Sequence, residues 1–153
     1  MRAVLQRVTH ASVRIGEELA SEISKGLCVL VGITHDDTAE DSEFIIRKIL
    51  NLRLFEDPES GKKWDKSVKD LGLDVLVVSQ FTLYGLLKGN KLDYHRAMEP
   101  TKAKEFYEKF YQDLQKAHIP VNVKDGEFGA MMSVGISNDG PVTIVVDSKD
   151  KSN

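Results

Sequence analysis

The sequence predicts a single mixed α/β (α+β) domain in which a twisted mixed β-sheet curls toward a barrel and two helices pack on one face. Three observations predict this class. Two continuous apolar runs, at 26–33 and 73–79, are typical of strands covered on both faces. Apolar stripes with helical spacing follow Thr38 and Pro100. Much of the remaining chain alternates polar and apolar residues, as strands do.

The first 33 residues are predicted to be strands joined by short turns. Residues 1–8 alternate in strand fashion, 11–15 do so again after a short turn, and 19–24 follow as a short strand. The run GLCVLVGI at 26–33 is apolar throughout, so both faces of that strand are expected to be covered. Cys28 lies in this run, where a buried thiol acts as a small hydrophobic side chain and not as a nucleophile.

A helix is predicted next. Asp37 and Thr38 offer an N-cap, and Glu40, three residues after Asp37, completes a capping box. The helix packs against the sheet through one stripe, formed by Ile45, Ile46, Ile49 and Leu50.

The middle of the chain is expected to be turn-rich on either side of a second buried strand. Residues 52–56 are predicted to form a short strand, and 57–70 a polar surface loop or hairpin with Trp64 as its anchor. The run LDVLVVS at 73–79 is the second buried strand, and 84–99 is predicted to be irregular.

The last third begins with a second helix, which Pro100 and Thr101 open and Pro120 ends. Its apolar stripe is Ala103, Phe106, Tyr107, Phe110, Tyr111, Leu114 and Ala117. Strands are predicted at about 121–125, 130–137 and 141–147, with an Asn-Asp-Gly hairpin turn between the last two. The sheet then has seven or more strands. Because no third helix is available for its other face, that face must close on itself or on a second copy, and a dimer is expected.

Composition limits the class of protein. The domain is expected to span 1–147, with a short polar tail at 148–153. No apolar run approaches the ~20 residues that cross a bilayer, no signal peptide is evident, and a single cysteine allows no internal disulfide. A cytoplasmic protein without a membrane partner is therefore expected. The four histidines lack metal-ligand spacing, so neither a metal nor another cofactor is expected.

The charge of the chain limits its nucleic-acid partners. A net charge of −3 argues against a protein that coats nucleic acid, and no DNA partner is expected. Contact with one end of an RNA is compatible with this charge. The basic stretch 88–96, with Lys102 and Lys104 after it, is interpreted as a solvated face, and RNA contact is the alternative.

Two segments break the pattern of ordinary core and surface. Ser79-Gln80-Phe81-Thr82-Leu83 places hydroxyl and amide groups at the carboxyl end of a buried strand, where ligand sites often lie; the alternative is a polar exit from the core. Asn138 to Thr143 is typical of a hairpin turn, but a Gly-Pro bond costs little to hold in cis and glycine permits close approach to a ligand. No base adjoins Thr82, so these residues alone indicate at most an ester or acyl site without a metal.

At these two segments the sequence resembles the D-aminoacyl-tRNA deacylase family. The family signatures SQ-x-x-L and N-x-G-P-[VF]-T stand here at 79–83 and 138–143. The resemblance extends over about 1–147, with further matches at 6–8, 48–53, 88–91 and Gly129. The chain departs from the family pattern at Leu92, Tyr94 and Met131.

The resemblance implies a homodimeric hydrolase that cuts the ester of D-aminoacyl-tRNA at the acceptor end, a proofreading step in translation that also removes glycine. Gly140 and Pro141, joined by a cis peptide, would enter the partner's pocket, accept the substrate's ammonium group and exclude L-side chains. The ester would be surrounded by Ser79, Gln80, Phe81 and Thr82. Arg7 would brace the Gly-Pro loop. Further binding positions implied by the resemblance are Asn138, Thr143, Phe128 and Met132.

Two questions stay open at the level of sequence. Thr82 is either the nucleophile or a positioning group beside a water that the 2′-OH of the terminal adenosine helps to activate, and the missing base favours the second. The alternative functions are editing of mischarged L-alanyl-tRNA by a relative with a trans Gly-Pro bond, and binding of the acceptor end without catalysis.

Overall fold

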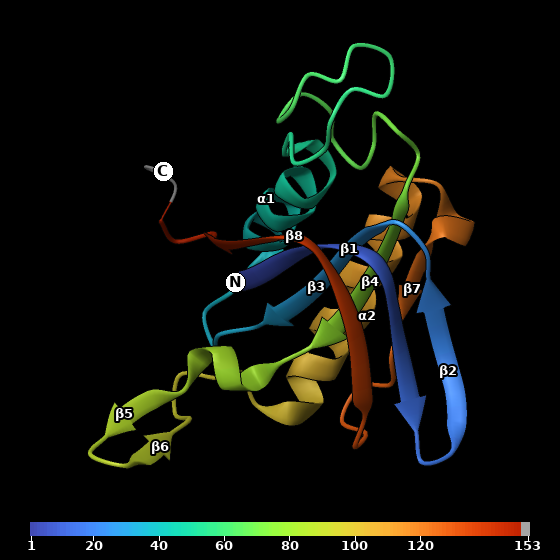
Figure 1. Cartoon of the computed structure of the whole chain (residues 1–153). Coiled ribbons are helices and arrows are strands. Elements are labelled where there is room, and N and C mark those ends of the chain that lie inside the picture. Colours follow the sequence, from blue (N-terminus) through green and yellow to red (C-terminus); the bar gives the residue numbers. More distant parts are fainter. Residues whose placement is uncertain (151–153) are drawn as a thin grey trace.

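A computed structural model describes residues 1–150, whose main sheet is curved and carries both helices on the same side (Figure 1). The strand order is β2-β1-β3-β4-β7, and β8 pairs with the other edge of β1. The strands of this sheet are β1 (Arg2–Ile15), β2 (Glu18–Ile23), β3 (Gly26–Gly32), β4 (Asp74–Ser79), β7 (Val123–Asp125) and β8 (Ser133–Asp147). The mixed class with two helices on one face is confirmed.

The main sheet has six strands within residues 1–150, fewer than the seven or more expected. The number is lower because two predicted pairs of strands each form one continuous strand, and because residues 52–56 form no strand. Segment 84–99 also differs from expectation, since it is not irregular throughout. It contains a separate antiparallel hairpin, made of β5 (Leu86–Lys88) and β6 (Lys91–Asp93). This hairpin projects from the sheet (Figure 1), and it follows a short 3₁₀ helix, η1 (Phe81–Tyr84).

The two helices begin with side-chain caps. Helix α1 (Ala39–Asn51) has Thr38 as N-cap, and Asp41, not Glu40, completes the capping box. The predicted box is wrong by one residue because the Asp37 carboxylate is used elsewhere, as an acceptor for the Thr34 N–H. Helix α2 (Pro100–Ala117) is capped by Glu99, and a second 3₁₀ turn, η2 (Pro120–Asn122), follows it.

Both faces of the sheet are covered in its centre. On one face, alternate residues of β1, β3 and β4 pack against the α1 and α2 stripes, with Ile45 and Phe110 fully buried. Ala117 of the predicted stripe is exposed, because it is the last residue of its helix. On the other face, a smaller core joins Val8, Cys28 and Leu76 to residues of β2 and β8, and it contains no helix residue. The central strands are therefore buried on both sides, as their apolar runs predict.

The second face is covered because the sheet curls on itself. The two halves of β1 pair with different strands, its first half with β3 and its second half with β2, and its register shifts between Val13 and Arg14. The opposite ends of the sheet then approach each other, so that the Ser21 hydroxyl of β2 donates a 2.7 Å hydrogen bond to the Asp125 carbonyl of β7. The sheet is thus nearly closed into a barrel.

Two pairs of predicted strands are single continuous strands. Residues 1–8 and 11–15 belong to β1, and residues 133–147 form β8, which runs antiparallel to β1 from Arg2 to Arg14. The predicted hairpin at Asn-Asp-Gly is therefore wrong. A hairpin would leave part of the outer edge of β1 unpaired. A continuous β8 instead provides hydrogen-bond partners for the backbone groups of β1 along nearly its whole length.

The segment between α1 and β4 also differs from expectation. Residues 52–56 form no strand, only an isolated bridge between Phe55 and Lys66. Trp64 does not anchor the loop, because its side chain is 56% exposed. Phe55 is buried in its place at 1% exposure, which accounts for the packing of this loop on the core.

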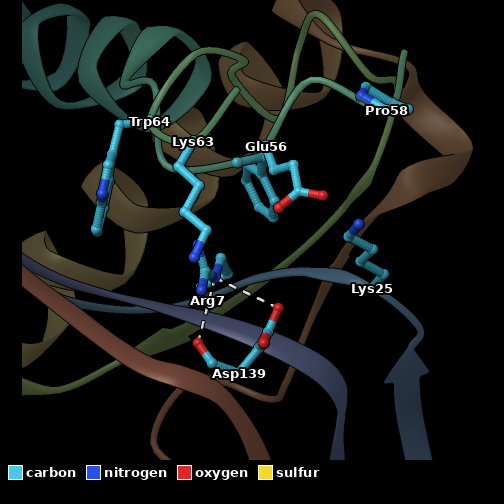
Figure 2. Close-up of a pocket in the computed structure, with 8 residues that line it drawn as sticks. Arg7, Lys25, Glu56, Pro58, Lys63, Trp64 and Asp139 are labelled. Atoms are coloured by element: carbon cyan, nitrogen blue, oxygen red, sulfur yellow. Dashed lines mark hydrogen bonds and ion pairs between the residues drawn. The ribbon is translucent and has the colours of Figure 1, made fainter. Parts of the chain in front are cut away.

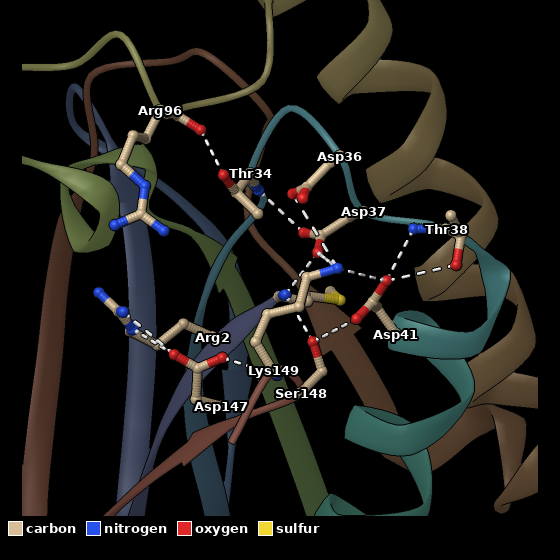
Figure 3. A network of polar contacts seen from close by, with 11 residues as sticks. Arg2, Thr34, Asp36, Asp37, Thr38, Asp41, Arg96, Asp147, Ser148 and Lys149 are labelled. Atoms are coloured by element: carbon tan, nitrogen blue, oxygen red, sulfur yellow. Dashed lines mark hydrogen bonds and ion pairs between the residues drawn. The ribbon is translucent and has the colours of Figure 1, made fainter. Parts of the chain in front are cut away.

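The two ends of the described chain meet in a buried polar cluster (Figure 3). The ammonium group of Met1 donates to the carboxylate of Asp37 and to the hydroxyl of Ser148. Ser148 in turn donates to Asp41 at 2.6 Å, and Lys149 donates to Asp41 at 3.1 Å. Ser148 is only 2% exposed, so the packed chain continues beyond the predicted boundary at 147. Residues 151–153 of the predicted tail lie outside the described residues.

Asp41 is expected to contribute to stability above about pH 4. Burial raises its pKa, but hydrogen bonds from Ser148, from the Thr38 N–H and from Lys149 outweigh this and hold the pKa well below the usual range. A lowered folded-state pKa stabilises the fold above the unfolded value of about 3.9, and the effect is lost as the pH falls through the folded-state pKa.

Asp41→Asn should therefore reduce the free energy of unfolding at pH 7 by about 2 kcal/mol, measured by urea denaturation. The difference from the wild type should shrink as the pH falls below 4. Asp36→Asn is the control, because Asp36 lies 4.0 Å from Lys149 and is 64% exposed, so its loss should cost under about 0.5 kcal/mol. Equal losses in the two variants would contradict the assignment.

Candidate functional site

The first motif forms a turn over the end of β3. β4 ends at Ser79, the Gln80 N–H donates to the Val31 carbonyl at 2.7 Å, and the chain then enters η1. This close approach requires Gly32, because a Cβ built there would lie 2.9 Å from the Leu83 Cβ. We call residues Ser79–Leu83 the corner.

The corner presents polar side chains and one aromatic ring to solvent. The Gln80 amide donates to the Thr82 hydroxyl at 2.6 Å, and no base is hydrogen-bonded to that oxygen within residues 1–150. Phe81 is 57% exposed and packs edge-on against Tyr94, with ring centroids 5.0 Å apart. A hydroxyl that accepts from an amide is not activated for attack, whereas it is well suited to position a neighbouring group.

Arg2 holds the corner against the sheet, a role that the sequence pattern does not reveal. Its guanidinium donates to the Leu83 carbonyl at 2.7 Å and pairs with Asp147 at 3.0 Å. It also lies over the Tyr84 ring, 4.6 Å from the centroid. Tyr84 is buried and its hydroxyl has no hydrogen-bond partner within residues 1–150. In sequence, Arg2 is one polar position of an alternating strand, and only the fold brings it to residues about 80 positions away.

The second motif forms a bulge inside β8. Asn138 pairs with Val8 and Thr143 with Gln6, so residues 139–142 stand opposite the single residue Arg7. We call residues 139–142 the bulge. The Gly140–Pro141 peptide in it is cis, and Gly140 has a φ of +123°, which L side chains rarely adopt. The extra residues leave the pleat of the strand, and Gly140 and Pro141 are exposed.

Arg7 connects the bulge to the loop that follows α1. Its Nε donates to the Asp139 carbonyl at 3.2 Å and lies 3.4 Å from the Asp139 carboxylate. Its Nη1 donates to the Leu54 carbonyl at 2.7 Å. One guanidinium therefore reaches two segments of backbone that no secondary structure joins, which a five-donor planar group does well.

A pocket of about 500 Å³ lies on the side of the bulge that faces this loop (Figure 2). We call it the bulge pocket. It is lined by Arg7, Lys25, Phe55, Glu56, Pro58, Lys63, Trp64 and Asp139. No corner residue lines it.

The corner and the bulge of one chain lie far apart. Arg7 on β1 lies opposite the bulge. On the same strand, Ala3 lies four residues away and pairs with Val31 of β3, which in turn pairs with Ser79 of the corner. Four strand residues span roughly 13 Å, and β8 and β4 are separated by three strand spacings of roughly 14 Å in total. One chain therefore does not bring its two motifs into a single pocket.

Comparisons with known proteins identify the family of the chain. The sequence profile described as D-Tyr-tRNA(Tyr) deacylase matches residues 4–147. The chain belongs to this family.

Relatives in the deacylase family are similar over nearly the whole chain. A Dictyostelium discoideum protein named D-aminoacyl-tRNA deacylase is 52% identical, over 99% of this chain and 100% of its own length. The Homo sapiens protein named D-aminoacyl-tRNA deacylase 1 is 55% identical, over 97% of this chain and 70% of its own. A solved structure titled "c-Myc DNA Unwinding Element Binding Protein" is 55% identical, with a TM-score of 0.92 over 96% of this chain and 98% of that one.

A more distant structure supports the fold alone. It is titled as a structural analysis of a probable eukaryotic D-amino acid tRNA deacylase, and it is 17% identical with a TM-score of 0.84. It covers 95% of this chain and 98% of that one.

Two other positions singled out by the deacylase resemblance lie near the end of β7. Phe128 is half-buried against Tyr107, with ring centroids 5.6 Å apart. Met132 packs onto Gly126, where a Cβ would lie 2.5 Å from its sulfur. Both side chains also contact the hydrophobic cores, so they have a structural role whatever else they do. Asn138 and Thr143 delimit the bulge and are exposed.

Neither cysteine chemistry nor a metal cluster finds a suitable arrangement in residues 1–150 of this deacylase-family chain. Cys28 is fully buried, and burial raises the pKa of its thiol to about 11, which makes it unreactive at neutral pH. Within residues 1–150, no three His, Cys, Asp or Glu side chains converge as metal ligands would. Neither helix of the described chain has the length and apolar content that a membrane span requires.

Proposed function

We propose that this chain hydrolyses the ester bond of D-aminoacyl-tRNA and glycyl-tRNA, and that its active site forms between two copies. The family and the relatives named D-aminoacyl-tRNA deacylase support the reaction. The observation that carries the shared site is the distance between the corner and the bulge within one chain. Phe81 and Thr82 of the corner are exposed, as are Gly140 and Pro141 of the bulge, so each motif is available to a second copy.

The surface of β8 is suited to such a partner. Val145 on β8 is 66% exposed, and Met131, just before the strand, is 90% exposed. Apolar side chains with this exposure gain free energy when a second copy covers them. If one bulge reaches the other copy's corner, a twofold arrangement makes the same contact a second time, because both subunits use the same patch.

Discrimination between D and L substrates would come from the bulge backbone. Arg7 ties the bulge to the loop after α1, so its carbonyl groups have fixed directions. With the ammonium group held by carbonyl oxygens and the ester held at the corner, an L-side chain would point into backbone, which has no rotamer with which to yield. A D-side chain would point to solvent, and glycine has no side chain to exclude.

The corner would hold the ester and stabilise its transition state. Gln80 and Thr82 are already oriented by their mutual hydrogen bond. Phe81 and Thr82 begin η1, and the N–H groups of a first helical turn lack intrahelical acceptors, so they are suited to a developing oxyanion. Water attacks the ester carbonyl and loses a proton. The terminal 2′-OH relays this proton to the 3′-oxygen, which leaves as a hydroxyl group. Thr82 positions these groups and does not attack.

The proposal is tested by incubating the protein with D-tyrosyl-, L-tyrosyl-, glycyl- and L-alanyl-tRNA and measuring the ester that remains. D-tyrosyl- and glycyl-tRNA should be deacylated, and L-tyrosyl-tRNA should persist. Rapid loss of L-alanyl-tRNA alone would indicate the editing of mischarged tRNA instead. If all four esters persist while the tRNA binds, the protein is a binding module and the proposal is wrong.

A further inference from the structure

We infer that the bulge pocket binds a nucleotide of the single-stranded acceptor end of tRNA, with its base on Trp64 and its phosphate between Lys25 and Lys63. This inference rests on the proposed function, because it takes the RNA as the substrate. A pocket of about 500 Å³ has room for one nucleotide. It opens beside the bulge, since Asp139 both lines the pocket and precedes Gly140.

The charge of the bulge pocket favours an anion. It contains three basic side chains and two acidic ones, although the whole chain has a net charge of −3. Arg7 is paired with Asp139, whereas Lys25 carries no such partner in the described chain and Lys63 extends toward Arg7 (Figure 2). Lys25 and Lys63 both line the pocket, so a phosphate held between them would be attracted by both ammonium groups.

Trp64 supplies an aromatic face next to these cations. Its side chain is 56% exposed, and its ring centroid lies 5.9 Å from the Arg7 guanidinium carbon. Its φ of +56° is rare for a bulky residue. Cationic side chains around an exposed aromatic ring form the usual platform for single-stranded nucleic acid, because every base can stack on the ring.

The position of the bulge pocket determines which RNA segment it meets. The bulge of one copy is proposed to contact the amino acid held at the partner's corner. The nucleotides that precede the terminal adenosine would then run along the copy that donates the bulge. The pocket would therefore hold the RNA in trans, on the subunit opposite the one that holds the ester.

The experiment measures binding, so that it does not depend on hydrolysis. Two probes carry D-tyrosine through an amide in place of the ester: a full tRNA, and adenosine alone. The variants are Trp64→Ala and the double change Lys25→Glu/Lys63→Glu, and Kd is measured by fluorescence anisotropy. Each variant should weaken tRNA binding by about tenfold and leave adenosine binding within about twofold. The lysine variant should also flatten the slope of log Kd against log salt concentration, by about 0.7 for each phosphate that the protein no longer neutralises.

The controls distinguish a local site from a change in charge or assembly. Lys109→Glu/Lys116→Glu makes the same charge change on exposed positions of α2 and should leave both affinities unchanged. Trp64→Phe should retain most of the tRNA affinity, because it keeps a stacking face. Sedimentation velocity should show the same assembly for every variant.

The inference is overturned if the pocket variants bind tRNA as the wild type does, if both probes lose affinity equally, or if the variants lose the dimer. The last result would mean that a second copy covers the pocket. A wild type that binds tRNA through Trp64 but leaves D-tyrosyl-tRNA intact would reject the proposed function and keep the nucleotide site.

Discussion

Gly140→Ala should reduce kcat/KM for D-tyrosyl-tRNA on the order of 100-fold, while the protein stays folded. An alanine Cβ would lie 3.0 Å from both the backbone nitrogen and the Cγ2 of Val142, and 3.3 Å from Arg7 Nη2. The φ of +123° is also strained for any residue with a Cβ. The bulge must therefore shift and displace Arg7, and a displacement of about 1 Å at a positioning group costs about this much in rate. The fold should survive because the bulge is exposed on an edge strand.

Gly16→Ala is the matched control for this prediction. Gly16 also has a positive φ, of +61°, but a Cβ there would meet nothing within 4 Å. Its backbone strain should lower stability by about 1 kcal/mol and leave kcat/KM unchanged. Circular dichroism and thermal unfolding of both variants separate local from global effects. Full activity of the Gly140 variant would remove the basis for a backbone filter.

Mixing two inactive variants should restore deacylation. The first is Gly140→Ala, and the second is the corner variant Gln80→Ala/Thr82→Ala, which removes the amide and the hydroxyl that face each other at 2.6 Å. Each homodimer would carry two defective sites. In a heterodimer, the intact bulge of the corner variant meets the intact corner of the Gly140 variant, and one site is whole.

The expected recovery follows from counting sites. Random exchange makes half of the dimers mixed, each with one intact site, so activity should reach about a quarter of the wild-type value. The measurement is D-tyrosyl-tRNA hydrolysis after joint refolding of the two variants, with each variant refolded alone as the control. If the joint sample stays as inactive as its components, the site lies within one chain and the shared site is rejected.

The sequence pattern correctly predicted the elements that are recognised by which of their side chains are apolar and therefore buried. The apolar runs of β3 and β4 and the stripe from Ile45 to Leu50 are buried, because the hydrophobic effect selects them wherever the chain goes. The pattern was wrong at Asn138–Thr143, where local turn propensity indicates a hairpin. The long-range pairing with β1 overrides that preference and turns the same residues into a bulge.

Two other residues show the same limit. Trp64 was expected to be an anchor because large apolar side chains are usually buried, yet Phe55 takes that place and leaves Trp64 exposed on the surface. Arg2 carries no motif, and its contact with the Leu83 carbonyl exists only because the start of β1 pairs with the end of β3, over which the corner turns. Spacing along a chain does not specify contacts between strands that are distant in sequence.

By itself, the sequence determined the fold class, the two buried strands, both helices and the two family motifs, because these depend on local periodicity and on runs of consecutive residues. Only the tertiary structure decided how the motifs are placed. It puts the corner and the bulge at different ends of one sheet, and it lets Arg7 connect the bulge to a neighbouring loop. It also places Trp64 and two lysines around a pocket beside the bulge. The reason is physical. Strand register is set by the pairing of β1 with three other strands, and that pairing is a property of the whole packed sheet.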